Sequence, residues 1–217
     1  MNIKPQDDFD WQNVYPYAHY NQTQELEKEH HFDLPLDHKI DGGKLTYSGK
    51  PLVKNAEWLY EKIYELNPST IFEVGFGYCN HLLSIHRMLP KIQLSGCDIS
   101  YYQFANGLRK YGEELRQLQL QSSLFIGDFT EINIDKKYDL VYSQAVVMHM
   151  STEKSMKAIE KMCSISQKYV ICLDGGLVIP NIRDWLEQFG KVTYFDEWAN
   201  EFWTHNNISP FIIEVYS

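Results

Sequence analysis

The residues best suited to chemistry lie at positions 73–77, where the sequence reads Glu-Val-Gly-Phe-Gly. The stretch before the glycines is apolar and typical of a strand, and the stretch after them follows a helical period. Glycines at positions 75 and 77 let the chain turn sharply and approach a ligand closely. The helix that should begin near Tyr78 points free N–H groups at anionic ligand atoms. Residues 70–82 therefore predict a nucleotide-type loop, with an ordinary Gly-x-Gly turn as the alternative.

A second acid, Asp98, ends the next apolar run and follows Gly77 by 21 positions. A spacing of about 20 is expected for a carboxylate at the end of the second strand that reaches a ribose diol. One carboxylate can accept hydrogen bonds from both hydroxyls. A loop for a nicotinamide dinucleotide would have a third glycine where this chain has Asn80, so the pattern disfavours that ligand.

Strand and helix patterns alternate from about residue 52 to the end, and the elements that they predict must position the glycine loop. It predicts a parallel, doubly wound α/β sheet of the Rossmann-like type. The last two predicted strands are separated only by a loop, which fits an antiparallel final hairpin. The predicted strands are 70–74, 92–97, 122–126, 138–143, 169–173, 192–195 and 211–215, and the predicted helices are 52–66, 78–89, 101–120, 151–166 and 180–189.

Four polar residues fall at the carboxyl ends of the first four predicted strands. In open α/β sheets the ligand binds along that edge, at the point where the strand order reverses. Side chains at four successive strand ends therefore predict one common site. The four residues are Glu73, Asp98, Asp128 and Gln144.

The acid-x-Gly-x-Gly pattern, the acid order and the closing hairpin resemble the class I S-adenosylmethionine-dependent methyltransferases. The resemblance covers about residues 52–217, and the family often has a further glycine where this chain has Cys79. It implies a seven-stranded Rossmann-like sheet with an antiparallel last strand. It also implies S-adenosyl-L-methionine as methyl donor and S-adenosyl-L-homocysteine as product. We expect this domain at residues 51–217, after an N-terminal extension at residues 1–50.

The resemblance also implies roles for the residues of the loop and the strand ends. The glycines would let the methionine part lie against the backbone, and Glu73 would orient its amino group or a nearby water. Asp128 would take the adenine amine while the backbone of Phe129 reads the ring edge, and Ile99 and Tyr101 either sandwich the adenine or pack in the core. The expected cofactor-binding residues are Glu73, Gly75, Gly77, Asp98, Ile99, Asp128, Phe129 and Gln144.

His149 is the first candidate for a general base, because it follows the fourth strand and an unperturbed histidine has a pKa of about 6.5. A capping or core histidine is the alternative. His19 is a weaker candidate, together with His30, His31 and His38, if the N-terminal segment folds over the site. Displacement at a sulfonium methyl mainly requires alignment and exclusion of water, so a base is needed only where the acceptor must lose a proton.

Residues 1–50 are rich in aromatic residues and histidine and show little regular period. Such a segment has apolar surface to bury, so a solvated tail is disfavoured. It either packs over the core as padding or forms a lid that covers the cofactor and lines the acceptor pocket.

Composition narrows the remaining classes of function. The 217 residues are 44% hydrophobic, enough for one packed α/β domain, and the net charge of −9 disfavours a nucleic-acid substrate. No apolar run is long enough to span a bilayer. The four cysteines are widely spaced and are interpreted as reduced core thiols of a cytoplasmic protein, with no metal site.

We therefore predict a methyltransferase for a small-molecule acceptor, such as the hydroxyl of a sugar, a nucleotide-linked compound or another metabolite. The alternatives are an NAD-dependent oxidoreductase, a non-catalytic S-adenosylmethionine-binding or assembly module, and an enzyme of polyamine synthesis that uses a related donor. No nucleic-acid or membrane partner is expected, and the sequence does not indicate an oligomeric state.

Overall fold

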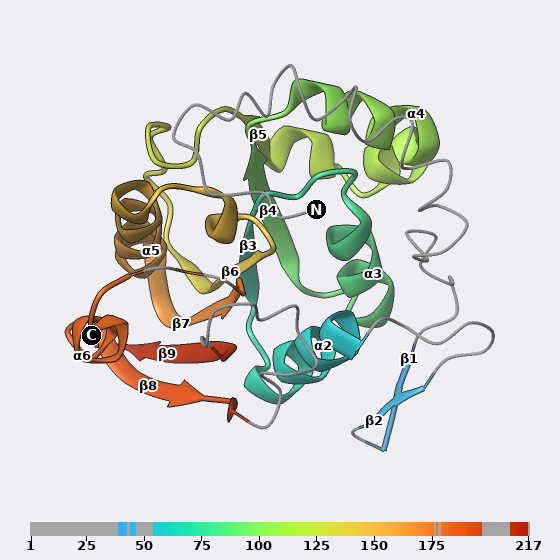
Figure 1. Cartoon of the computed structure of the whole chain (residues 1–217). Helices are drawn as coiled ribbons and strands as arrows, with labels where there is room; N and C mark the ends of the chain where they lie inside the picture. Colours follow the sequence, from blue (N-terminus) through green and yellow to red (C-terminus); the bar gives the residue numbers. More distant parts are fainter. Residues whose placement is uncertain are drawn as a thin grey trace.

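The computed structural model describes residues 39–42, 44–46, 54–175, 177, 179–196 and 209–216. Its centre is a seven-stranded sheet with helices on both faces, as Figure 1 shows. This is the Rossmann-like α/β architecture expected from the alternation of strand and helix patterns.

The sheet has the strand order β5-β4-β3-β6-β7-β9-β8, and the chain therefore reverses direction across the sheet between β3 and β6. The five strands from β5 to β7 pair in parallel, whereas β9 is antiparallel to both β7 and β8. The predicted antiparallel last strand is confirmed. The strands are β3 (Thr70–Val74), β4 (Gln93–Asp98), β5 (Leu124–Ile126), β6 (Tyr138–Gln144), β7 (Ser166–Leu173), β8 (Gly190–Tyr194) and β9 (Phe211–Val215).

The helices form a layer on each face of the sheet. Helices α2 (Lys54–Leu66), α3 (Asn80–Met88) and α4 (Tyr101–Gln117) cover one face, and α5 (Thr152–Ile165) and α6 (Ile182–Leu186) cover the other (Figure 1). Two 3₁₀ turns are η1 (Leu120–Ser123) and η2 (Val147–His149). None of the helices in the described part of the chain has the length and apolar character of a membrane span.

A two-stranded hairpin of β1 (Lys39–Asp41) and β2 (Lys44–Thr46) lies in the N-terminal extension. The sequence did not predict these strands, because residues 1–50 show little regular period. Leu45 is buried in the same cluster as the apolar side chains of α2 and α3, so this part of the extension packs against the domain.

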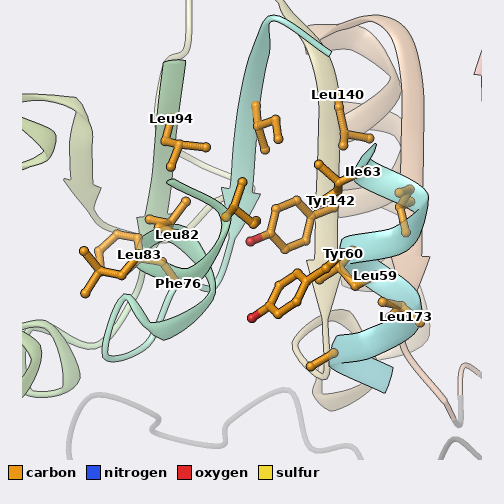
Figure 2. Close-up of a cluster of buried hydrophobic side chains, with 14 of the residues drawn as sticks. Leu59, Tyr60, Ile63, Phe76, Leu82, Leu83, Leu94, Leu140, Tyr142 and Leu173 are labelled. Carbon is orange, nitrogen blue, oxygen red and sulfur yellow. The ribbon is translucent and has the colours of Figure 1, made fainter. Parts of the chain in front are cut away.

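The core is divided between the two faces of the sheet because successive side chains of a strand point to opposite sides. On the side of α2 and α3, Figure 2 shows Leu59 and Ile63 packed beside Leu140 and Tyr142. On the other side, residues of β6, β7 and β9 pack against α5. The four cysteines are all buried and free, as predicted.

Candidate functional site

The glycine loop bends over the end of the neighbouring strand β4. The N–H groups of Gly75 and Phe76 both donate to the carbonyl of Cys97, at 2.7 and 3.3 Å. Gly75 and Gly77 have φ angles of +79° and +52°, which L side chains rarely adopt. Cys79 is also left-handed, with a φ of +68°, so α3 begins at Asn80 rather than near Tyr78.

Asp98 holds this loop through both of its carboxylate oxygens. One oxygen accepts the N–H of Gly77 at 2.8 Å and the other accepts the N–H of Ser100 at 2.7 Å. The residue is only 7% exposed, and burial raises the pKa of its carboxyl while the two hydrogen bonds oppose that rise. Each oxygen keeps a further lone pair, so the carboxylate can still accept hydrogen bonds from a diol. Asp98 is therefore in direct contact with the glycine loop. The sequence predicted only a ribose role for Asp98, and that role stays a prediction.

Protein atoms already occupy the space that a side chain at either glycine would need. A Cβ atom on Gly75 would lie 2.2 Å from Cγ2 of Val146, and one on Gly77 would lie 2.9 Å from Oε1 of Gln103. Val146 belongs to the segment that follows β6. Gly75 is therefore the point where that segment and the loop after β3 meet. We call the region around Glu73, Gly75, Gly77 and Asp98 the edge site.

Glu73 is a buried carboxyl that forms no ion pair with any lysine, arginine or histidine in the described part of the chain. It is 1% exposed, and its Oε2 atom makes no hydrogen bond with any residue that the structure describes. Tyr142, its register partner on β6, and Gln144 likewise carry buried oxygen atoms that lack such a bond. Burial raises the pKa of Glu73 well above its ordinary value, the nearby charge of Asp98 adds to this rise, and the neighbouring hydroxyl of Tyr142 opposes it. Unpaired acceptors beside a glycine loop fit a ligand that carries an ammonium group.

His81 of α3, the partner of Tyr60, does not supply a positive charge. The hydroxyl of Tyr60 and Nδ1 of His81 are 2.8 Å apart. Burial lowers the pKa of His81 to about 4, so its ring is neutral at pH 7. Figure 2 shows the hydroxyl ends of Tyr60 and Tyr142 directed toward the same side. The sequence pattern predicted that Tyr60 and His81 lie in helices, but it did not predict that either residue lies near the site.

Asp128 lies next to Asp98 but is engaged by protein groups. The N–H of Gly127 donates to the carbonyl of Asp98 at 2.9 Å, which brings the two strand ends together. One oxygen of Asp128 accepts from the N–H and hydroxyl of Thr130, and the other accepts from Lys154 at 2.5 Å. Burial raises the pKa of Asp128, but these donors outweigh it, so the pKa lies below its ordinary value.

The aromatic side chains proposed for the adenine have different surroundings. Phe129 is buried and its ring lies 6.1 Å from that of Phe72, so its side chain belongs to the core and only its backbone can meet a ligand. Tyr101 is 68% exposed, and Ile99 is partly buried. The structure thus leaves Tyr101 accessible and places Ile99 directly after Asp98.

The segment after β6 is held by an acid that sequence reasoning left without a role. Asp174 follows β7 and accepts the N–H groups of Val146 at 2.6 Å and Met148 at 3.2 Å. His149 ends this segment, is partly buried, and donates its N–H to the carbonyl of Val146. An acid at the end of the fifth strand was the available signal for Asp174, because the four other strand-end residues follow the same pattern. The candidates His19, His30, His31 and His38 lie outside the described residues.

Residues 71–168 match the family described as a methyltransferase domain. This match spans β3 to the start of β7 and includes the glycine loop, Asp98, Asp128 and Gln144. No curated protein is similar enough in sequence to match the chain.

Solved structures with the same fold cover most or all of the chain. Magnesium protoporphyrin IX methyltransferase (ChlM) from Synechocystis PCC 6803, with bound SAM, is 16% identical and covers 100% of both chains with a TM-score of 0.61. The methyltransferase domain of bacterial CtHen1 is 13% identical, with a TM-score of 0.57, over 76% of this chain and 98% of that one. TehB from Haemophilus influenzae is 14% identical, with a TM-score of 0.53, over 72% and 60%. At these identities the likeness concerns the fold.

Proposed function

We propose that the chain is a class I S-adenosylmethionine-dependent methyltransferase, because residues 71–168 match the methyltransferase-domain family. Its proposed acceptor is a small molecule, methylated at a hydroxyl of a sugar, a nucleotide-linked compound or another metabolite. The donor is S-adenosylmethionine, and the product from it is S-adenosylhomocysteine. The observation that carries the proposed placement is the edge site, where a glycine loop, a loop-bound Asp98 and an unpaired Glu73 meet at the strand-order reversal.

Each part of the donor has a chemically suitable partner at the edge site. The remaining lone pairs of Asp98 suit the ribose hydroxyls, and the buried Oε2 of Glu73 suits the amino group or a water bound to it. Gln144 adds a buried amide oxygen that lacks a hydrogen bond with any described residue. Asp128 and the backbone of Phe129 would meet the adenine, with Asp128 oriented by Lys154. Ile99 and Tyr101 would lie against the ring.

The bound donor supplies an activated methyl group, so the protein mainly has to align the acceptor and exclude water. His149 is placed on the segment that approaches Gly75 through Val146, and it is our candidate for removing a hydroxyl proton. The acidic character of the chain, with a net charge of −9, favours a small acceptor over a nucleic acid. Such chemistry on metabolites is expected in the cytoplasm.

The N-terminal extension is proposed as a lid over the same edge. Six large apolar side chains are exposed in the described part of the chain, and four of them, Tyr101, Tyr102, Phe125 and Ile126, lie at the start of α4 and the end of β5. Ile126 is the register partner of Asp98, so this apolar surface borders the edge site. The aromatic residues of positions 1–38 would cover it. Deletion of residues 1–38 and the Phe125→Ser substitution should then weaken cofactor binding non-additively.

Isothermal titration with S-adenosylhomocysteine tests the cofactor assignment. The wild-type protein should bind it with micromolar affinity, and Asp98→Ala should weaken binding by about 100-fold, as expected for two lost charge-assisted hydrogen bonds. Glu113→Ala, a change of an exposed acid on α4, serves as the matched control and should leave affinity unchanged. An unchanged affinity in Asp98→Ala would show that the ribose does not bind there.

The acceptor proposal needs a separate measurement. Transfer of a labelled methyl group to a panel of hydroxyl metabolites, a protein extract and RNA should label members of the metabolite panel. Label found only in the protein or RNA fraction would remove the small-molecule proposal.

A further inference from the structure

We propose that Asp174 is a positioning residue for cofactor binding. It fixes the segment after β6 (residues 145–149) against the glycine loop and so maintains the shape of the edge site. This inference rests on the proposed placement of the cofactor at the edge site. Asp174 would act through the segment rather than by touching the donor.

Among the described residues, the side chain of Asp174 contacts this segment and its own strand, β7. Asp174 is 3% exposed and follows β7 directly, where Leu173 is level with Gln144 of β6. One of its oxygens accepts the N–H groups of both Val146 and Met148. The other is 3.3 Å from Sγ of Cys172, which donates to it. Burial raises the pKa of the Cys172 thiol, so the thiol keeps the proton that it donates.

The segment needs such a partner because its backbone is strained. Ala145 has a φ of +54°, a conformation that a residue with a side chain adopts only when its surroundings hold it there. The N–H of Ala145 donates to the carbonyl of Leu173, and the next two bonds of the turn end on the single carboxylate oxygen of Asp174. Bonds to a carboxylate are stronger than bonds to a neutral acceptor. Asp174 thus holds a turn that the sequence of the segment alone does not favour.

This turn also determines which side chain borders the glycine loop. Val146, whose N–H is bound by Asp174, is the side chain that fills the space over Gly75. Gln144 lies just before the turn and carries the unpaired amide oxygen proposed to face the donor. If this turn lost its hydrogen bonds to Asp174, the side chain of Val146 would therefore move away from Gly75, and the side chain of Gln144 would no longer be held in one orientation. Cofactor affinity should fall even though Asp174 is not itself in contact with the ligand.

Asp139 provides a matched control at the opposite end of the sheet. It is 7% exposed, accepts the N–H of Ser69 at 2.7 Å and pairs with Lys168 at 3.0 Å. Like Asp174, it is a buried acid that ties a backbone N–H of a neighbouring connection to its own strand. It lies at the start of β6, whereas the edge site lies at the end of that strand. Loss of Asp139 should therefore lower stability without changing the site.

The experiment compares Asp174→Asn and Asp174→Ala with Asp139→Asn and Asp139→Ala in the full chain. Calorimetric titration gives the dissociation constant for S-adenosylhomocysteine, and scanning calorimetry gives the melting temperature. The neutral amide of Asp174→Asn keeps an acceptor but loses the charge, so we expect its dissociation constant to be about threefold larger than that of the wild type. In Asp174→Ala the dissociation constant should be about 30-fold larger. Both Asp139 variants should lower the melting temperature and keep the wild-type dissociation constant.

The outcomes separate this inference from the proposed function. If the wild-type protein gives no binding heat, the proposed cofactor site fails, and the inference fails with it. If the wild-type protein binds but Asp174→Asn matches its dissociation constant, or the Asp139 variants lose affinity to the same degree, Asp174 has only a structural role and the inference is overturned. Because the Asn variants differ from the native residues by one atom type, this comparison stands even if an Ala variant does not fold.

Discussion

Replacement of Gly75 by alanine should destabilise the protein far more than the same change at Gly77. At both positions the backbone is left-handed, which costs alanine about 1–2 kcal/mol. At Gly75 the new methyl group would also lie 2.2 Å from Cγ2 of Val146, and overpacking of this kind costs about 1–3 kcal/mol more. At Gly77 it would meet only Oε1 of Gln103, the far end of a flexible side chain that can move aside. We expect the free energy of unfolding to fall by about 2–5 kcal/mol in Gly75→Ala and by about 1–2 kcal/mol in Gly77→Ala.

A double-mutant cycle with Val146→Ala separates the two contributions at Gly75. The substitution removes Cγ1 and Cγ2, which would lie 2.9 and 2.2 Å from the new methyl group, and leaves Cβ at 3.1 Å. The steric part should therefore be relieved in the double variant, while the backbone part stays. The expected coupling is about 1–3 kcal/mol, with the cavity cost of Val146→Ala measured in the single variant.

Urea denaturation of the wild type, the three single variants and the Gly75→Ala/Val146→Ala double variant supplies the free energies of unfolding. The reasoning is refuted if the two glycine substitutions differ by less than about 0.5 kcal/mol, or if the coupling is below that value, the level at which independent sites already scatter. Val146 would then not fill the space over Gly75, and the glycine would be required by its backbone angle alone.

Three other substitutions test the charges and hydrogen bonds around the edge site. Lys154→Met should lower the free energy of unfolding by about 1 kcal/mol at pH 7, because Lys154 helps to lower the pKa of Asp128. When stability is measured at decreasing pH, this difference from the wild type should shrink below about pH 4, where Asp128 takes up a proton. Glu73→Gln should make the cofactor-free protein more stable at pH 7. Because the pKa of Glu73 is raised, wild-type stability should decline as the pH rises above about 4.3, and calorimetry from pH 4 to 8 should show that the variant lacks this decline. Tyr60→Phe should cost about 1–3 kcal/mol in urea denaturation, since it leaves Nδ1 of the buried His81 without its hydroxyl partner, and an unchanged midpoint would contradict that contact.

The fold could be predicted closely because its signals are local. The last strand begins and ends where the sequence pattern placed it, at Phe211 and Val215, since an apolar run there is bounded by a proline and a polar end. The start of α5 was also predictable, because the side chain of Ser151 caps the helix by accepting the N–H of Lys154. Such features depend on a few neighbouring residues and survive without knowledge of the tertiary structure.

Helix ends were predicted less well where non-glycine residues adopt the left-handed conformation. Cys79 and Gln119 do so and shift the start of α3 and the end of α4 by two or three residues from the predicted positions. Asn181 does so before α6, which is shorter than the predicted helix 180–189. Neither cysteine nor glutamine has a strong intrinsic preference for this conformation, so nothing in the sequence marks these positions.

The site was predictable at the strand ends but not in the contacts that surround them. Asp98 stands at the spacing from Gly77 that the loop pattern leads one to expect, but its hydrogen bond to the N–H of Gly77 was not predicted. In contrast, 28 positions separate Val146 from Asp174, and 26 separate Asp128 from Lys154. These pairs depend on how β6 aligns with β7 and on where α5 lies relative to the connection after β5, which a single sequence does not specify. The ligand roles of the strand-end residues stay predictions.

The three acids at the carboxyl edge have different surroundings, which gives them different capacities toward a ligand. Asp128 is already neutralised by Lys154, whereas Asp98 accepts two backbone N–H groups and has no cationic partner among the residues that the structure describes. Glu73 alone is buried with an oxygen that no described residue binds. A cationic ligand therefore gains most at Glu73, and its charge should matter there more than at the other two. S-adenosylmethionine carries a sulfonium charge that S-adenosylhomocysteine lacks, so the difference between their affinities should be smaller in Glu73→Gln than in the wild type.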